Sequence, residues 1–474
     1  MNFVSSSFFL FLPIFLVGAL VLNGSSRLWF YTVMSYFFYA WSFPPYVLLL
    51  FTATLVNFLA GKWIMRSSIP CRKKLFLAVS LIVSLGTLGF YKYIGFFKQI
   101  TNFVLSIFGA NLKISLPEII LPIGISFYTF QAISYSIDIY RQRVEPAKSF
   151  LEFACYVAFF PQLVAGPIVR SHEFLSQIPN HEPFRKDDII RGSELLLIGF
   201  FKKCVIADNA ARFVDPIFAS SGDFGGGVIW LGSFFFAVQI YCDFSGYTDI
   251  ARGLGRILGF EFPENFRWPY FSASIKEFWQ RWHITLSFYI RDYLYIPLGG
   301  SRVSHSRLFF NLLTTWFLVG LWHGASYNYI CWGLYFGFLL FFERFLTKLS
   351  LPSFNFLRSP VFKVPFTFLL VTFGWVIFRN NELGNTYLMW KKMLLPAEGF
   401  LQGLPDYLGW GPPILSLGAL LIVHWITYTL RYNSSDYVLL QKCPYFMRVI
   451  LLALVTSLII VFAGQERAFI YFQF

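Results

Sequence analysis

The chain alternates between apolar stretches and short polar connectors along its whole length. A helix that crosses a bilayer needs about 20 mostly apolar residues. The stretches that approach this requirement are Phe8–Leu22, Leu28–Ala40, Tyr46–Leu59, Leu75–Tyr91, Phe103–Leu116, Ile119–Ile139, Phe150–Val164, Glu194–Ile206, Val228–Tyr241, Leu308–Trp322, Tyr327–Phe342, Val361–Phe378, Ile414–Leu430 and Val449–Ala463. Several are too short or too polar for a simple span, so we expect roughly 11 to 13 transmembrane helices with some short or re-entrant pieces.

One region, Tyr241–Ser301, breaks this pattern because it is both densely aromatic and charged. Its charged residues are Asp243, Asp249, Arg252, Arg256, Glu264, Arg267, Lys276, Glu277, Arg281, Arg291 and Asp292. Irregular backbone at membrane depth is tolerated only where protein shields it or where it lines a wet cavity. We therefore predict short amphipathic or re-entrant helices in the centre of this region, with Glu277 and Arg281 paired one helical turn apart.

Composition supports the same class of protein. The 474 residues are 57% hydrophobic and 13% charged, whereas a soluble domain carries about 25% charged residues. No Lys or Arg precedes the first apolar stretch, so we interpret it as a retained helix and not as a removable signal peptide. Basic residues in short loops explain most of the net charge of +14, although some could attract an anionic substrate. We predict an all-α polytopic membrane protein with one integral domain over residues 1–474 and no nucleic-acid partner.

Two histidines in apolar surroundings are the first candidates for chemistry, because ionisable groups at membrane depth are expensive. His323 ends an apolar helix, where a neutral imidazole could take a proton from an alcohol or could simply bond a carbonyl. His283 lies between Arg281 and Thr285. It could orient a substrate, stabilise a developing negative charge or share the proton transfer; it could equally be an interfacial histidine of an aromatic belt.

Other kinds of site find little support. The chain has no GxSxG nucleophile motif and no phosphate-binding loop, and its six cysteines suggest neither a disulfide framework nor a zinc site. The two candidate histidines lack an obvious third metal ligand, and His172 and His181 are most simply part of a solvated loop. The run Gly253–Gly259 (GLGRILG) follows no strand, so tight helix packing explains it better than nucleotide binding.

Five segments together resemble the membrane-bound O-acyltransferase (MBOAT) family. Within that family they are most similar to the bacterial alginate O-acetyltransferase branch (AlgI), with the D-alanyl transferase DltB more distant. The segments are Leu121–Arg141 (LPIGISFYTFQAISYSIDIYR), Phe159–Arg170 (FFPQLVAGPIVR), Gln239–Gly255 (QIYCDFSGYTDIARGLG), the His283 block Phe266–Ser301, and Gly320–Gly333 (GLWHGASYNYICWG). They occur in the order typical of the family, with the core motifs over 121–333 and C-terminal helices over 361–474. The region after Phe378 resembles the family mainly in its hydrophobic pattern.

The resemblance implies a ring of helices around a thin centre, in which a tunnel joins a cytoplasmic donor to an acceptor on the other side. His323 then falls at the catalytic position, as the base, and His283 at the second polar position of the active site. An acyl-histidine intermediate stays open. Further residues expected to line the tunnel or touch substrate are Trp282, Arg281, Trp322, Asp243, Asp249 and Asn311.

The expected reaction moves an acyl group, with acetyl as the first choice, from acetyl-CoA or another thioester to a hydroxyl of an exported polysaccharide or of a relay protein. The resemblance implies no bound cofactor or metal, a bacterial inner-membrane location, and an extracytoplasmic partner of the SGNH type or similar. Two rivals stay open. Intramembrane His and Asp residues also suit the proton relay of a transporter. The second rival is a non-catalytic scaffold of a polysaccharide-export complex, against which the complete motif around His323 argues.

Overall fold

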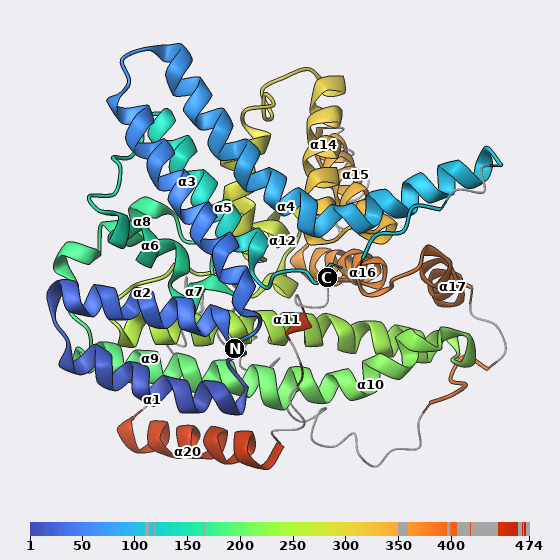
Figure 1. Cartoon of the computed structure of the whole chain (residues 1–474). Helices are drawn as coiled ribbons and strands as arrows, with labels where there is room; N and C mark the ends of the chain where they lie inside the picture. Colours follow the sequence, from blue (N-terminus) through green and yellow to red (C-terminus); the bar gives the residue numbers. More distant parts are fainter. Residues whose placement is uncertain are drawn as a thin grey trace. The chain divides into compact units, whose positions relative to one another are not determined.

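The computed structural model describes residues 1–109, 113–117, 119–164, 166–348, 359–395, 399–404, 418, 444–462, 467 and 469–470. Within these residues the chain forms helices joined by turns, and its β-type pairing is an isolated antiparallel bridge between Phe266 and Trp282 (Figure 1). The chain divides into two compact units. Unit 1 comprises Met1–Leu196 and Ile250–Pro263, and unit 2 comprises Leu197–Asp249 and Glu264–Phe474. The predicted all-α class is confirmed, whereas the single integral domain stays a prediction.

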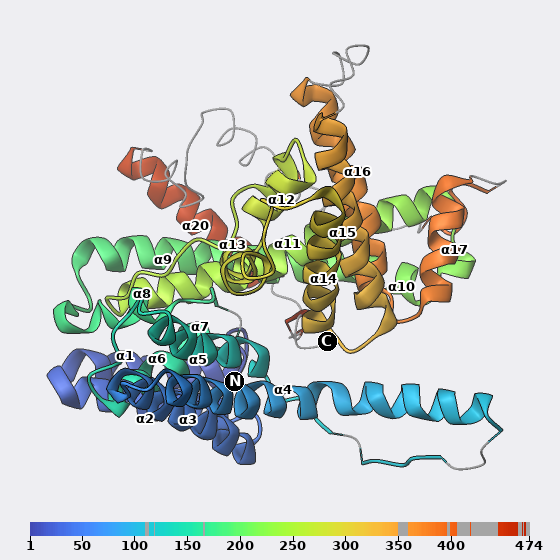
Figure 2. The same cartoon turned by 90° about the horizontal axis from the view of Figure 1, so that it is seen from above.

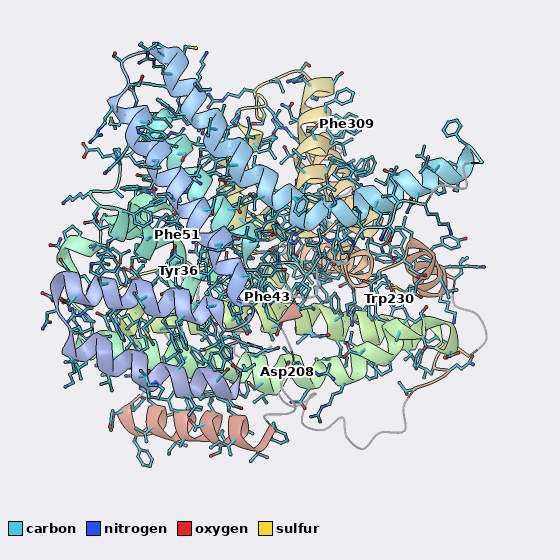
Figure 3. The ribbon with its side chains drawn as sticks, viewed as in Figure 1. Tyr36, Phe43, Phe51, Asp208, Trp230 and Phe309 are labelled. Carbon is cyan, nitrogen blue, oxygen red and sulfur yellow. The ribbon has the colours of Figure 1, made fainter. Side chains whose placement is uncertain are left out.

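Unit 1 is built mainly from the N-terminal helices. These are α1 (Ser6–Val21), α2 (Gly24–Ala40), α3 (Val47–Arg66), α4 (Pro70–Ile107), α5 (Ile125–Tyr140), α6 (Phe150–Ala158), α7 (Phe160–Leu163), α8 (Ser171–Leu175) and most of α9 (Lys186–Phe200). Aromatic contacts join them: Phe51 of α3 packs against Phe150 of α6 with ring centroids 5.9 Å apart, and Figure 3 labels Phe51 together with Tyr36 of α2.

A buried polar network also joins α3, α4 and α5. The Asn57 amide oxygen accepts hydrogen bonds from Ser80 (2.7 Å) and Ser136 (2.9 Å), while its amide nitrogen donates to Ser84 (2.9 Å) and to the Ala53 carbonyl (2.8 Å). Both the oxygen and the nitrogen of the amide are thereby satisfied. Buried polar groups are stable only when they are bonded in this way.

Besides the 3-10 turns η4 (Ser221–Asp223) and η5 (Pro269–Phe271), unit 2 contains the longer described helical segments of the rest of the chain. These are the π-helical segment η3 (Phe201–Ala207), α10 (Asp208–Ala219), α11 (Gly226–Ile257), α12 (Ile275–Arg281), α13 (Ile284–Ile290), the π-helical segment η6 (Arg291–Tyr295), α14 (His305–His323), α15 (Tyr327–Lys348), α16 (Pro360–Arg379), α17 (Leu383–Leu394) and α20 (Tyr445–Phe462). Helix α11 ends in unit 1, and the indole nitrogen of Trp230 near its start donates to the Met393 carbonyl of α17 at 3.0 Å (Figure 3).

Helices α14 and α15 lie side by side in both views (Figures 1 and 2), and glycines allow their close approach. A Cβ atom on Gly320 would overlap the Tyr329 carbonyl oxygen, and one on Gly333 would overlap the Trp316 carbonyl oxygen. Small residues that let two backbones meet are a common device for packing helices in membranes. The crossing lies one turn before His323, so it fixes the end of α14.

Six helical stretches in the described part of the chain are long and apolar enough to cross a membrane. They are Pro44–Arg66, Pro70–Ile107, Gly226–Ile257, Tyr327–Leu346, Pro360–Arg379 and Tyr445–Phe462, with Ser6–Val21 as a shorter apolar helix. The chain is therefore a multi-pass membrane protein. The predicted stretch Ile414–Leu430 falls outside the described residues, apart from residue 418, and the total of roughly 11 to 13 helices stays a prediction.

Candidate active site

The charged residues of the region Tyr241–Ser301 begin inside a helix and not in irregular backbone. We expected a span to end at Tyr241, but α11 continues to Ile257 and carries Asp243 and Asp249 within it. That expectation is wrong because lysines on the preceding helical segment neutralise both acids. The Lys203 ammonium lies 2.6 Å from Asp243, and the Lys202 ammonium lies 2.7 Å from Asp249.

Lys203 is held by two carboxylates, since Asp208 at the start of α10 (Figure 3) also lies 2.8 Å from it. Burial lowers the pKa of Lys203, but Asp243 and Asp208 together outweigh this effect and raise it above its usual value. Burial raises the pKa of Asp208 to about 6 against the opposing charge of Lys203, and Asp243 adds to that rise. One buried cation shared by two acids thus leaves one acid that binds its proton more tightly.

The centre of the region consists of the short helices α12 and α13, as predicted. The predicted pair is also present: the Arg281 guanidinium lies 2.7 Å from the Glu277 carboxylate. The backbone N–H of Arg267 donates to the carbonyl of Arg281 at 2.9 Å, next to the Phe266–Trp282 bridge. These contacts fold the segment before α12 back onto the junction between α12 and α13.

His283 occupies that junction in a left-handed backbone conformation, with φ 44° and ψ 55°. This conformation costs a residue with a side chain roughly 1–2 kcal/mol and is often found at functional sites. The His283 Nδ1 atom lies 3.0 Å from the Asn265 amide oxygen, and the ring packs against Phe244 of α11 with centroids 4.8 Å apart. His283 is 1% exposed, and this burial lowers its pKa to about 3.

His323 ends α14, as the apolar pattern predicted, and is buried. Three helices contribute aromatic rings around it. Its ring centroid lies 4.9 Å from that of Trp322, 4.8 Å from that of Trp332 of α15, and 5.3 Å from that of Phe378 of α16. The Trp322 ring also lies 6.1 Å from that of His283. One indole thus contacts both candidate histidines.

The other expected tunnel residues divide into two groups. Trp282 lies among aromatic rings: its ring centroid is 4.8 Å from that of Trp375 of α16 and 5.6 Å from that of Phe278. Asn311 does not join the histidines: it donates to the Gly300 carbonyl at 3.2 Å, and its position 12 residues before His323 corresponds to about 18 Å along a helix. Whether any of these residues touches substrate stays a prediction.

The other histidines and the glycine run that the sequence singled out make packing contacts or lie at the surface. His181 is half-buried, with its ring 4.5 Å from that of Phe260 and its Nε2 atom within hydrogen-bond reach of the Leu258 carbonyl, so it is less solvated than expected. His172 is exposed, as expected, but it lies in the short helix α8 and not in a loop. The predicted tight packing in the glycine run is confirmed at Gly253, where a Cβ atom would crowd the carbonyl oxygen of Gly192.

Sequence reasoning missed Asn265, Lys202 and Lys203. Asn265 is 1% exposed and lies in the loop before α12, where no periodic pattern marks a residue as buried. The two lysines carried a stronger signal. Adjacent lysines near the end of an apolar stretch, one helix before two intramembrane aspartates, could have indicated buried ion pairs.

The fold and this cluster define a multi-pass membrane protein with two buried histidines that contact one tryptophan. The family model of MBOAT, the membrane-bound O-acyltransferase family, matches residues 142–381, a span that contains both histidines and their aromatic neighbours. The chain belongs to this family. It is therefore an O-acyltransferase, and the transporter and scaffold alternatives lose their support.

Individual relatives agree with the family. The chain is 42% identical to the probable alginate O-acetylase AlgI of Pseudomonas aeruginosa over 83% of this chain and 75% of that protein. It is 32% identical to the peptidoglycan O-acetyltransferase of Helicobacter pylori over 98% of this chain and 96% of that protein. The teichoic acid D-alanyltransferase of Bacillus subtilis is more distant, at 29% identity over 55% and 69% of the two chains. The predicted resemblance is confirmed.

Proposed function

We propose that this protein transfers an acetyl group from a thioester donor on the cytoplasmic side to a hydroxyl of an exported cell-surface polysaccharide, directly or through a relay protein. The names of two relatives support an O-acetyl product on a glycan, one on alginate and one on peptidoglycan. The observation that carries the proposal is the pair of buried histidines in contact with one indole, Trp322.

The chemistry needs a base and an activated donor. An alcohol is barely ionised at neutral pH, so removal of its proton in the transition state accelerates attack. In the proposed step the acceptor oxygen loses its proton to His323 and bonds to the thioester carbonyl carbon. The carbon–sulfur bond then breaks, and the leaving thiolate takes up the proton. Acetyl-CoA is the proposed donor, and no ATP-binding motif is required because the thioester is already activated.

His283 has two conceivable roles in this step. It could hold the acceptor hydroxyl, or it could donate a hydrogen bond to the thioester oxygen as negative charge develops there. The aromatic rings of Trp332 and Phe378 around His323 would exclude water and so limit hydrolysis of the donor.

A separate extracytoplasmic acyltransferase of the SGNH type or similar is the proposed partner, and the bacterial inner membrane is the proposed location. Both follow from the family branch that the sequence resembles. A thioester donor made in the cytoplasm and a glycan outside the membrane require the acyl group to cross, which suits a polytopic enzyme with buried chemistry.

The test is acyl transfer from [¹⁴C]acetyl-CoA in sealed membrane vesicles that contain the full chain together with its native partner proteins and glycan. His323→Ala should reduce label in the glycan fraction by about 100- to 10,000-fold, the range typical of general-base catalysis. The matched control is His305→Ala, at the exposed first residue of the same helix, which should keep wild-type transfer.

Protein amount and thermal stability are measured for each variant. Full transfer by His323→Ala at equal protein amount would remove His323 as the base. Absence of label transfer from acetyl-CoA by the wild type, with label transferred from another acyl thioester, would overturn the proposed donor.

A further inference from the structure

We propose that Asn265 is a positioning residue that fixes the tautomer and orientation of His283, so that His283 Nε2 acts as a hydrogen-bond acceptor for the substrate hydroxyl. This inference rests on the proposed function, because it takes the hydrogen-bond donor to Nε2 to be the hydroxyl of the substrate. The tautomer of His283 can be measured without any assay of activity. It selects one of the two roles left open for His283.

Three polar groups meet at the side-chain oxygen atom of Asn265. The Asn265 amide oxygen lies 3.2 Å from the backbone nitrogen of Thr285, 2.9 Å from the Thr285 hydroxyl and 3.0 Å from His283 Nδ1. A backbone N–H can only donate, so the Asn265 atom at this point must be the oxygen and must accept. His283 Nδ1 therefore carries a hydrogen and donates it.

The protonation state of Nε2 follows from that of Nδ1. A neutral imidazole has one N–H, and here it is on Nδ1, so the lone pair is on Nε2. Asn265, Phe244 and Trp322 lie against the His283 ring, and these three side chains carry no charge. Burial among them lowers the pKa of His283 to about 3 and keeps the ring neutral. Nε2 can accept a hydrogen bond from an alcohol but cannot donate one to an oxyanion.

Asn265 also holds the backbone around His283. Its carbonyl accepts the N–H of Ile284 at 2.9 Å, and its side-chain oxygen accepts the N–H of Thr285. The first two N–H groups of α13 are thus bonded by Asn265, in a helix whose N-cap residue, His283, supplies no side-chain bond. The Asn265 amide nitrogen is buried without a partner among the described residues. The side chain therefore acts through its oxygen.

The experiment reads the tautomer directly. The full chain, in lipid nanodiscs and labelled with ¹⁵N-histidine, is measured by solid-state NMR, and the His283 signals are identified by their loss in His283→Gln. We expect a neutral ring protonated at Nδ1 in the wild type. Asn265→Asp keeps an accepting oxygen and should keep Nδ1–H, whereas Asn265→Leu should give a mixed or Nε2–H population.

Activity adds a second readout that a structural role alone would not move. A carboxylate at position 265 favours the imidazolium form of His283, so Asn265→Asp should lose transfer relative to the wild type on the acid limb of the pH–rate profile, where His283 takes up a second proton. At pH values above that limb its transfer rate should recover toward wild type. Asn265→Leu should lose about 10- to 100-fold at every pH, as expected when a hydrogen bond that orients a catalytic imidazole is removed.

Two neighbouring variants serve as controls. Thr285→Val removes one donor to Asn265 but leaves the His283 bond, so the Nδ1–H signal should persist. Ser287→Ala, on α13, should leave tautomer and transfer unchanged. An Nε2–H tautomer in the wild type, or an unchanged Nδ1–H population in folded Asn265→Leu, overturns the proposal. A correct tautomer with no acetyl transfer in any assay would instead contradict the proposed function alone.

Discussion

Two buried asparagines, Asn57 in unit 1 and Asn265 in unit 2, each organise a network of hydrogen bonds, but the networks differ in what they hold. Asn57 bonds three serine hydroxyls and one carbonyl, and these contacts only join α3, α4 and α5. Asn265 bonds a threonine and an imidazole at a strained turn between two short helices. The first network contains no titratable group, whereas the second contains one.

This difference refines the rule that polar groups at membrane depth are functional. Burial alone does not separate the two asparagines, since Asn57 is 0% and Asn265 is 1% exposed. The features that separate them are a partner that can exchange a proton and a left-handed backbone that a stable helix bundle does not need.

The largest effect is expected at the imidazole itself. His283→Ala removes the proposed acceptor for the substrate hydroxyl, so acetyl transfer in membrane vesicles should fall by about 100- to 1,000-fold, the cost typical of losing one pre-organised hydrogen bond at the reacting centre. Asn57→Ala should keep wild-type transfer per folded molecule, because its network touches no reacting group. If Asn57→Ala lost as much transfer as His283→Ala at equal folded protein, the distinction between the two networks would fail.

Removing one partner from a buried network of charged groups should cost more free energy of unfolding than removing one from a neutral network. Lys203→Met should lower the free energy of unfolding by about 3–5 kcal/mol, because Asp243 and Asp208 would lose the cation that compensates their burial. The measurement is a denaturant titration of the purified protein in mixed micelles. Arg291→Met removes the cation of a more exposed pair with Asp292 and should change the free energy by less than about 1 kcal/mol. Equal losses for both variants would contradict the role of burial.

The neutral network should contribute stability of intermediate size. Asn57→Ala deprives Ser80, Ser84 and Ser136 of their shared partner, and hydrogen bonds between membrane helices are worth about 0.6–2 kcal/mol each. Three such bonds are lost, so we expect a loss of about 2–3 kcal/mol in the same titration. The control is Thr52→Ala, on the exposed part of α3, whose hydroxyl donates to the Leu48 carbonyl of its own helix at 2.7 Å. No loss for Asn57→Ala relative to Thr52→Ala would show that the network does not stabilise unit 1.

Local patterns predicted the parts of the molecule that local forces determine. The apolar stretch before His323 predicted a helix that ends there, and α14 does end at His323. The spacing of Glu277 and Arg281 predicted their ion pair, which needs only one helical turn. The density of aromatic and charged residues after Tyr241 also indicated short helices, and α12 and α13 are seven residues each.

Features that depend on distant partners were beyond that reasoning. Helix α11 passes through Asp243 because Lys203, 40 residues earlier in the chain, pairs with it. The contact of both histidines with Trp322 depends on how α11, α14 and the α12–α13 junction pack. The contact between Asn265 and His283 joins residues 18 positions apart, at a turn where His283 adopts the left-handed conformation. No single-residue propensity predicts that turn.

The smallest expected effect isolates this turn from the chemistry of the ring. His283→Ala and His283→Gly both remove the imidazole, but glycine adopts φ 44° and ψ 55° without steric cost while alanine does not. His283→Gly should therefore be more stable than His283→Ala by about 1 kcal/mol, although both should lack transfer activity. The same pair of substitutions at Ser287, inside α13, should give the opposite order by about 0.5–1 kcal/mol, since glycine weakens a helix interior. If alanine were the more stable residue at position 283, the backbone there would not be strained, and Asn265 would have no strained turn to hold.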